Sequence, residues 1–131
     1  MSDIMAKQPK RILVAEDDRF LAMALQAQLV RSGFDVIVAR DGEQALNLAR
    51  TEAPHLILLD LIMPKLQGFE VLRLLKQEEK TASIPVIVLS NLGQEIDLET
   101  VTQAGAQGYF VKSRTPLKDI VNEVVKTLAE V

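Results

Sequence analysis

The chain has 131 residues, 48% of them hydrophobic, no cysteine and a formal net charge of −3. This length and composition predict a single globular domain and exclude a disordered chain, a disulfide framework and any cysteine nucleophile or thiolate metal site. The longest apolar runs are too short to span a bilayer, and no basic stripe offers a footprint for a nucleic-acid backbone. We therefore expect a cytoplasmic protein whose partners are neither membranes nor nucleic acids.

Two patterns of apolar residues, one typical of strands and one typical of helices, alternate along the chain and predict the order of its elements. Residues 1–9 lack the apolar segment of a secretory signal, so we interpret them as a flexible leader to one domain over residues 10–131. Short apolar runs predict five strands, at residues 11–15, 34–39, 55–60, 84–90 and 108–111. Helical spacing of apolar residues predicts five helices, at residues 20–32, 41–52, 67–79, 94–104 and 115–128.

Polar residues at the expected helix starts support these boundaries. Asp41 and Gln44 have the spacing of a capping box. Asp18 precedes the first helix and Thr115 precedes the last, in positions where a side-chain oxygen accepts hydrogen bonds from the first turn. We interpret both as N-caps.

The alternation of strands and helices indicates the fold class. Nearly continuous apolar strands are typical of a parallel sheet that is covered by helices on both faces. Right-handed crossovers then favour an α/β, flavodoxin-like doubly wound sheet with strand order 2-1-3-4-5. In such a sheet the first and third strands are neighbours, and ligands bind beyond the carboxyl ends of the strands.

Acidic residues lie at the ends of those two neighbouring strands. Glu16 and Asp17 follow the first strand, and Asp60 ends the third. We expect the three carboxylates to converge, which is unfavourable unless a hard cation lies among them. Because Mg²⁺ prefers carboxylate and phosphate oxygens with water, we predict a magnesium site, with Mn²⁺ as an alternative ion.

The remaining strand ends carry groups that suit phosphoryl transfer. A carboxylate such as Asp60 can attack phosphorus and form an aspartyl phosphate. Lys112, after the fifth strand, would neutralise charge on the transferred group together with the metal. The hydroxyl of Ser90, at the end of the fourth strand, is able to donate to the phosphoryl oxygens.

Four segments at these strand ends resemble the response-regulator receiver domain of two-component signalling. They are Ile-Leu-Val-Ala-Glu-Asp-Asp at 12–18, Leu-Asp-Leu-Ile-Met-Pro-Lys-Leu-Gln-Gly at 59–68, Pro-Val-Ile-Val-Leu-Ser at 85–90 and Gly-Tyr-Phe-Val-Lys at 108–112. The resemblance covers the chain from Lys10 onward. Each segment alone is a weak signal, but all four in this order are highly specific.

The resemblance implies a role for each matching residue. Asp60 would be the phosphoacceptor, and Asp17, Asp60 and the backbone carbonyl of Ile62 would hold Mg²⁺, with Glu16 contributing indirectly. Three further residues would contact the phosphoryl group or form the switch, namely the hydroxyl of Ser90, the aromatic ring of Tyr109 and the ammonium of Lys112.

Membership of that family would also imply partners. A sensor histidine kinase or a phosphotransfer protein would supply the phosphoryl group. A downstream protein target or a second copy would dock on the surface formed by the fourth helix, the fifth strand and the fifth helix. The chain would be a switch and not an enzyme, apart from its own phosphorylation and dephosphorylation. The sequence leaves open whether it stands alone or belongs to a longer regulator.

The chain departs from the family pattern at positions around the site. Ser113 stands where most receivers have proline, so the Lys112–Ser113 bond is expected to be either trans or a cis bond that costs roughly 2.5–4 kcal/mol. Asn91 is larger than the usual residue after the switch hydroxyl and would narrow the pocket or add a hydrogen bond. Ile62 and Leu92 would flank the phosphoryl group, and because neither orients water we predict a long-lived phosphorylated state.

Other functions are compatible with the same fold. A degenerate receiver would only dock partners, which the intact acidic and phosphate-contacting set argues against. A magnesium-dependent phosphohydrolase would place a second aspartate two residues after the nucleophile, where this chain has Ile62. A flavin or nucleotide binder would have a glycine-rich or hydroxyl-rich loop after the first strand instead of acids. His55, the only histidine, begins the third strand, at the end away from these groups, and is assigned no role.

Overall fold

The structure is a computed structural model that describes residues 8–91 and 98–129. Five parallel strands form one sheet: β1 (Arg11–Ala15), β2 (Asp35–Ala39), β3 (Leu56–Asp60), β4 (Val86–Ser90) and β5 (Gly108–Val111). Five helices and one 3-10 turn connect or follow them: α2 (Arg19–Arg31), α3 (Gly42–Glu52), α4 (Gly68–Gln77), α5 (Leu98–Gln103), η1 (Lys112–Arg114) and α6 (Leu117–Ala129). The strand order is β2-β1-β3-β4-β5, which confirms the predicted doubly wound topology.

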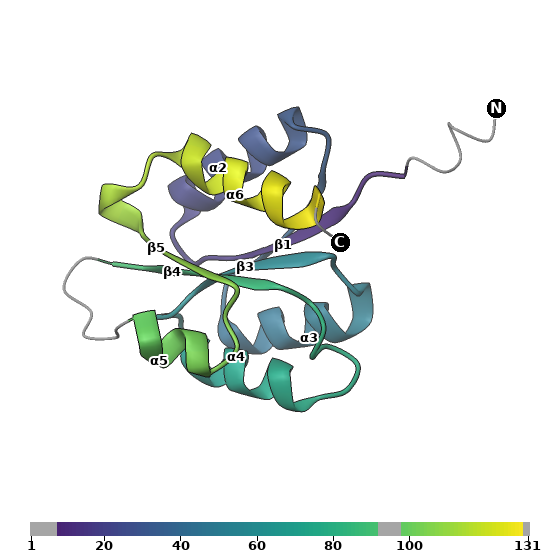
Figure 1. The fold of residues 1–131 in the computed structure, drawn as a ribbon, viewed down its shortest axis with the longest axis vertical. Helices are drawn as coiled ribbons and strands as arrows, with labels where there is room; N and C mark the ends of the chain where they lie inside the picture. The colour runs from purple at the N-terminus through teal and green to yellow at the C-terminus, as the bar shows by residue number, and fades with distance from the viewer. Residues whose placement is uncertain (1–7, 92–97, 130–131) are drawn as a thin grey trace.

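Helices cover both faces of the sheet (Figure 1). Helices α2 and α6 lie on one face, and α3, α4 and α5 lie on the other. Each face has its own cluster of buried apolar side chains, because alternate residues of every strand point to opposite sides. All residues of β3 and β4 are buried, which explains why these strands are continuous apolar runs instead of alternating ones. No helix in the described part of the chain is long and apolar enough to cross a membrane.

The predicted helix caps are mostly found. Asp18 Oδ1 accepts hydrogen bonds from the amides of Phe20 and Leu21 at 3.0 and 3.2 Å, so Asp18 is the N-cap of α2. Asp41 Oδ1 accepts from the Gln44 amide at 2.7 Å and caps α3 in the same way.

The start of the last helix differs from the prediction. Helix α6 begins at Leu117, and the hydroxyl of Thr115 donates to the Val111 carbonyl at 2.8 Å. The physical reason is the 3-10 turn η1, which the apolar pattern did not indicate and which brings Thr115 back over the end of β5. The interpretation of Thr115 as the cap of this helix was therefore wrong.

The register of the sheet determines which strand ends meet. Ala15 pairs with Leu59, and Asp60 pairs with Leu89 in the parallel ladders. Ser90 pairs with Val111 at the end of the last ladder. The residues that follow β1, β3, β4 and β5 therefore lie along one edge of the sheet.

Candidate functional site

Asp60 is the last residue of β3 and lies at the centre of the carboxyl edge of the sheet. Its side chain is only 2% exposed. Oδ1 accepts a hydrogen bond from the amide of Ile62 at 3.2 Å, and Oδ2 lies 3.0 Å from Lys112 Nζ. One oxygen is therefore held by the chain that follows Asp60, and the other faces a cation from the end of β5.

Glu16 and Asp17 reach the same place from the end of β1. Glu16 is 1% exposed, and its Oε2 accepts a hydrogen bond from the Asp18 amide at 3.0 Å. Asp17 is exposed. A carboxylate oxygen from each of Glu16, Asp17 and Asp60 lies within 4.8 Å of the others, so the structure brings together the three acids that the strand order predicts.

Lys112 joins the two buried acids. Its Nζ lies 2.8 Å from Glu16 Oε1 and 3.0 Å from Asp60 Oδ2. Glu16 Oε1 is nevertheless a buried atom that accepts no well-directed hydrogen bond among the described residues, so its contact with Lys112 is that of an ion pair. Two buried carboxylates thus share one ammonium group.

The pKa values of these groups reflect two opposing effects, burial and the attraction between the carboxylates and Lys112. Burial raises the pKa of Glu16 from 4.5 to about 7, against the lowering effect of its hydrogen bonds and of Lys112. Burial also raises the pKa of Asp60, and Lys112 again opposes the shift. For Lys112, burial lowers the pKa but the two carboxylates outweigh it, so its pKa is raised. The metal-free site therefore carries unfavourable negative charge.

The residues fit a hard divalent cation. The cluster offers three carboxylates, which is the oxygen-rich donor set that Mg²⁺ and Mn²⁺ prefer. One buried oxygen, Glu16 Oε1, lacks a well-directed hydrogen bond and would gain from added positive charge or ordered water. Asp17 is exposed and would hold the ion from the solvent side. A bound cation would also offset the cost of burying the Glu16 and Asp60 carboxylates, which is what raises their pKa values.

These shifts predict how the stability of the metal-free protein depends on pH. Between about pH 4.5 and 7 the folded state keeps the Glu16 proton that the unfolded state has lost. Folding then takes up a proton, so the free energy of unfolding must fall as the pH rises through this window. We expect a loss on the order of 1–3 kcal/mol between about pH 5 and 8, measured by urea denaturation in EDTA.

The control for this pH dependence is a matched substitution. Glu16→Gln should flatten the profile, whereas Glu43→Gln, at an exposed acid in the first turn of α3, should leave it unchanged. A metal-free parent whose stability does not vary over this pH range would contradict the assignment.

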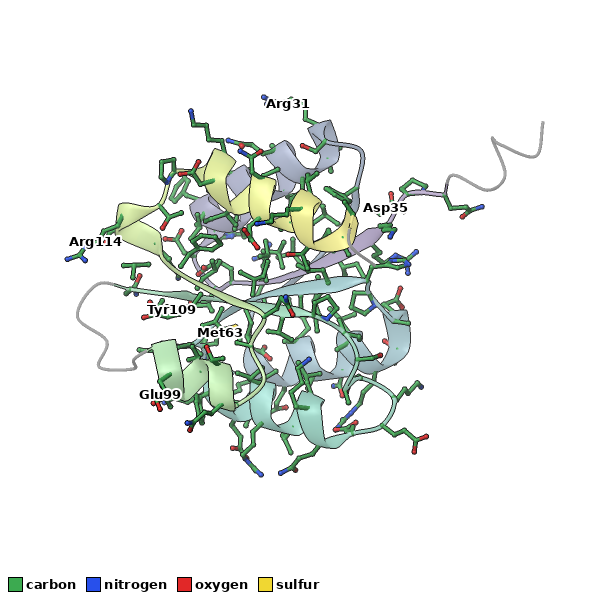
Figure 2. All side chains as sticks on the ribbon, viewed as in Figure 1. Arg31, Asp35, Met63, Glu99, Tyr109 and Arg114 are labelled. Atoms are coloured by element: carbon green, nitrogen blue, oxygen red, sulfur yellow. The ribbon has the colours of Figure 1, made fainter. Side chains whose placement is uncertain are left out.

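Ser90 and Tyr109 form a second contact at this edge. Ser90 is fully buried at the end of β4, and its hydroxyl donates to the Tyr109 hydroxyl at 2.9 Å. The Tyr109 ring packs against the cluster of buried side chains that includes Met63 (Figure 2). Met63 follows Asp60 by three residues, so the aromatic ring on β5 and the loop after Asp60 belong to the same packed core.

Three residues are expected to lie beside a phosphoryl group, and the structure describes two of them, Ile62 and Asn91. Ile62 is 51% exposed and Asn91 is exposed, so both side chains are accessible from solvent. Leu92 lies outside the described residues.

The Lys112–Ser113 peptide bond is trans, since the described chain contains no cis bond. Replacing the usual proline by Ser113 therefore leaves Lys112 at the acids through a trans path.

His55 lies at the opposite edge of the sheet, away from these groups. Its Nδ1 accepts a hydrogen bond from the Arg11 amide at 3.0 Å, at the first residue of β1. It joins the starts of β1 and β3 and is not part of the acidic cluster.

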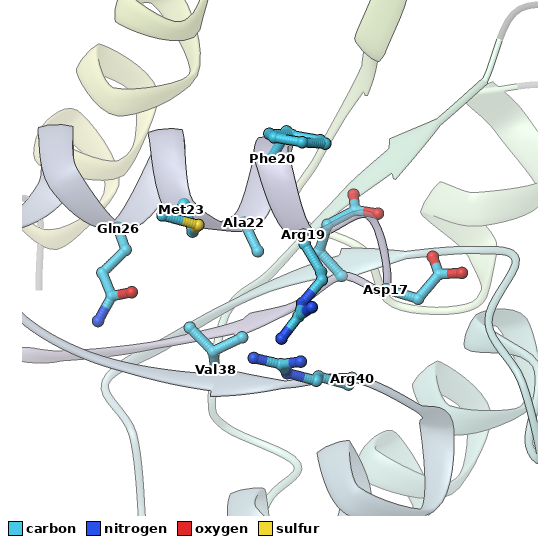
Figure 3. A pocket seen from close by; sticks show the side chains of 9 residues that line it. Asp17, Arg19, Phe20, Ala22, Met23, Gln26, Val38 and Arg40 are labelled. Carbon is cyan, nitrogen blue, oxygen red and sulfur yellow. The ribbon is translucent and has the colours of Figure 1, made fainter.

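A pocket that the sequence did not indicate opens beside Asp17. Its volume is about 270 Å³, and Glu16 and Asp17 line one end, whereas Asp60 and Lys112 are not among its lining residues. The side chains of Arg19 and Arg40 lie close together in it (Figure 3). Arg40 follows β2, the neighbour of β1. The acids were identified because they lie at the carboxyl ends of strands, and the same criterion would also have identified Arg40.

Comparisons with known proteins agree with this geometry. The model of the response regulator receiver domain family matches residues 12–124. The chain is 41% identical over 119 residues to the alkaline phosphatase synthesis transcriptional regulatory protein PhoP of Bacillus subtilis, covering 91% of this chain and 48% of PhoP. It therefore spans about half the length of that relative.

Two solved structures with a metal ion are similar. The receiver domain of the sensor histidine kinase PA1611 of Pseudomonas aeruginosa, with magnesium in its active-site cleft, superposes with a TM-score of 0.80 at 26% identity, covering 91% of this chain and 97% of that one. The Mn²⁺-bound response regulator Rcp1 superposes with a TM-score of 0.73 at 34% identity, covering 88% and 89%. With the sheet order, the acidic cluster and the family match in agreement, the chain belongs to the response regulator receiver domain family.

Proposed function

We propose that Asp60 is the phosphoacceptor of a two-component phosphorelay and that its phosphorylation requires Mg²⁺. The observation that carries this proposal is the position of Asp60, whose carboxylate lies among two other acids and 3.0 Å from Lys112 Nζ. A purely structural buried aspartate would be paired one to one. Here two buried acids share one ammonium group, so the binding of a further positive charge at the site is favourable.

The residues suggest how phosphoryl transfer proceeds. An oxygen of Asp60 attacks the phosphorus of the donor and forms a new P–O bond. The bond between phosphorus and the donor breaks, and its electron pair leaves with the donor. Lys112 stays beside the acceptor and neutralises charge on the phosphoryl oxygens, an electrostatic role for which it is already positioned by Glu16 and Asp60.

Three groups would hold the metal ion. Asp17 and Asp60 supply carboxylate oxygens, the backbone carbonyl of Ile62 supplies a third ligand, and Glu16 acts indirectly. When bound, Mg²⁺ offsets the carboxylate charge and polarises the phosphoryl oxygens. The similar receiver of PA1611 carries magnesium in its cleft and Rcp1 is a Mn²⁺-bound form, which supports the same two ions for this chain.

The contact between Ser90 and Tyr109 supports a switch. A phosphoryl group on Asp60 adds acceptor oxygens that compete for the Ser90 hydroxyl. Ser90 then gives up its bond to Tyr109, the ring repacks, and the surface of α5, β5 and α6 changes. Tyr109 is the only tyrosine in a chain without tryptophan, so its fluorescence reports this step directly.

The partners follow from this role. A sensor histidine kinase or a phosphotransfer protein supplies the phosphoryl group, and a downstream protein or a second copy reads the surface of α5, β5 and α6. PhoP is named a transcriptional regulatory protein, but the match covers less than half of it. We propose that this receiver domain supplies the switch and makes no direct contact with nucleic acid. Its chemistry is limited to its own phosphorylation and dephosphorylation.

Incubation with acetyl phosphate tests the proposal. The parent protein should gain one phosphoryl group by intact mass spectrometry in Mg²⁺ and none in EDTA, with the label mapped to Asp60. A change in Tyr109 fluorescence should accompany the labelling. No labelling of the parent would refute the proposal and favour a degenerate receiver that only docks partners.

The lifetime of the phosphorylated state is a separate prediction. Ile62 is 51% exposed at the cleft and presents an apolar side chain where a polar one would orient water. Ile62→Asn should therefore speed the loss of label several-fold, and addition of Leu92→Glu should speed it further. The measurement is the decay of label after removal of acetyl phosphate. Equal decay in the parent and the double variant would show that these side chains do not control water.

A further inference from the structure

The turn between β2 and α3 is packed against the loop that follows Asp60. The Gly42 amide donates to the Pro64 carbonyl at 3.2 Å. A Cβ atom on Gly42 would lie 1.7 Å from the carbonyl oxygen of Leu66 and 2.6 Å from its carbonyl carbon. Both are backbone atoms, so no side-chain rotation could relieve the clash and one of the two segments would have to move.

Glycine at this position is required by space and not by backbone conformation. The glycines with positive φ are Gly33 and Gly105 among the described residues, and Gly42 is not one of them. An alanine could adopt the local backbone of Gly42 but could not coexist with Leu66 in its present place. In the sequence, the spacing of Asp41 and Gln44 signals the start of a helix but indicates no role for the glycine between them.

The loop from Leu61 to Gln67 has little freedom to absorb such a movement. Its far end is tied by the Gly68 amide, which donates to the Leu61 carbonyl at 2.8 Å. A Cβ atom on Gly68 would lie 2.0 Å from the Asp60 carbonyl oxygen, so that end is also in backbone contact. Between these ties the Leu66 amide donates to the Pro64 carbonyl at 2.8 Å in a tight turn.

The middle of the loop carries a further contact to the same turn. Lys65 has a positive φ of 70°, which is uncommon for a residue other than glycine. Its ammonium lies 3.6 Å from Asp41 Oδ2, while Asp41 Oδ1 caps α3. Lys65 is well exposed, so this ion pair contributes little by itself. The backbone contact of Gly42 is the stronger constraint on the loop.

We propose that Gly42 is a positioning residue for the metal site. This inference rests on the proposed function, in which the Ile62 carbonyl is a ligand. Pushing Leu66 away from the β2–α3 turn would displace a short loop that is pinned at Gly68, and the displacement would reach Ile62. Because Mg²⁺ requires nearly ideal octahedral geometry, a small shift of one carbonyl weakens its binding.

Gly42→Ala is the direct test, with Gly33→Ala as the matched control. Gly33 lies at the end of α2, has a φ of +97°, and a Cβ atom there would meet nothing within 4 Å. The control should therefore lower the melting temperature through backbone strain and leave Mg²⁺ affinity unchanged. Gly42→Ala should weaken Mg²⁺ binding about tenfold, measured by Tyr109 fluorescence and by competition with Mn²⁺ in electron paramagnetic resonance. Labelling by acetyl phosphate should recover at saturating Mg²⁺.

A folded Gly42→Ala protein with the Mg²⁺ affinity of the parent would overturn the inference. If that variant does not fold, Mg²⁺ titration of the ¹⁵N-labelled parent decides. The Gly42 amide, which bonds to the loop, should shift with the same midpoint as the Ile62 amide. The Gly33 amide is the control, since it lies just after α2 and bonds to the Val30 carbonyl at 3.0 Å, and it should not shift.

An unmoved Gly42 amide would also overturn the inference. Failure of the parent to bind Mg²⁺ at all would instead refute the proposed function, so the two failures are distinguishable.

Discussion

Replacing Asp60 with asparagine is expected to abolish phosphorylation while stabilising the metal-free fold. Asparagine has nearly the same shape but is not a nucleophile toward phosphorus, so acetyl phosphate should leave no label. The stability should rise because two buried carboxylates now share one ammonium group. The substitution leaves Glu16 and Lys112 as a one-to-one pair, which is the balanced arrangement.

The two readouts of Asp60→Asn are independent. Labelling is followed by intact mass, and the free energy of unfolding by urea denaturation in EDTA, where an increase on the order of 1 kcal/mol is expected. Added Mg²⁺ should reverse the order of stabilities, because the parent then gains more from the ion. The control is Asp18→Asn, since asparagine caps a helix about as well as aspartate and Asp18 lies outside the cluster.

Two results would contradict the predictions for Asp60→Asn. A label that persists in Asp60→Asn would place the phosphoacceptor elsewhere. A metal-free Asp60→Asn protein less stable than the parent would show that Lys112 satisfies both acids in full, against the raised pKa of Asp60.

Replacing Lys112 with methionine is expected to have the second large effect. Methionine keeps the apolar length of the side chain and removes its charge. Glu16 and Asp60 would then be buried without the ammonium group that they now share. We expect the metal-free protein to lose about 3 kcal/mol at pH 8, because the charges left behind are unpaired.

The same substitution should slow phosphorylation. Loss of one pre-positioned electrostatic contact to the transferred group typically costs about 10²–10³-fold in rate. The rate of labelling at saturating Mg²⁺ measures this effect. Lys118→Met, at an exposed residue of α6, is the matched control and should behave like the parent. Unchanged labelling by Lys112→Met would remove Lys112 from the phosphoryl site.

The two predictions together separate charge balance from chemistry. Asp60→Asn and Lys112→Met should change stability in opposite directions, because one removes an excess acid and the other removes the shared cation. Both should impair phosphorylation. A general loss of folding would lower the stability of both variants. Opposite changes in stability would therefore show that both residues act through the charge balance of the site.

Much of this protein could be predicted from local sequence. The apolar runs are continuous at β3 and β4 because both faces of these strands are covered, and this pattern requires a parallel sheet between helix layers. A parallel sheet brings carboxyl ends to one edge, so the convergence of Glu16, Asp17 and Asp60 followed from the strand order alone. Caps such as Asp18 could be identified because they act within one turn of chain.

Other features depend on contacts between segments that are far apart in the sequence. The capping interpretation failed at Thr115 because a 3-10 turn after β5 redirected its hydroxyl to Val111. The pKa of Glu16 is raised because burial removes it from water, and burial is a property of the packed molecule. The hydrogen bond between Ser90 and Tyr109 depends on how two adjacent strands place their side chains.

The acids at the carboxyl edge show where the sequence by itself was sufficient. Residue type and strand order determined that three carboxylates meet there, because the pattern of apolar residues specifies the sheet and the sheet specifies its edge. Only the tertiary structure decided that Lys112 is shared between two of those acids and that Gly42 touches the backbone of Leu66. Charge balance and backbone clearance are set by distances of a few ångströms between remote segments, and no local pattern in the chain encodes them.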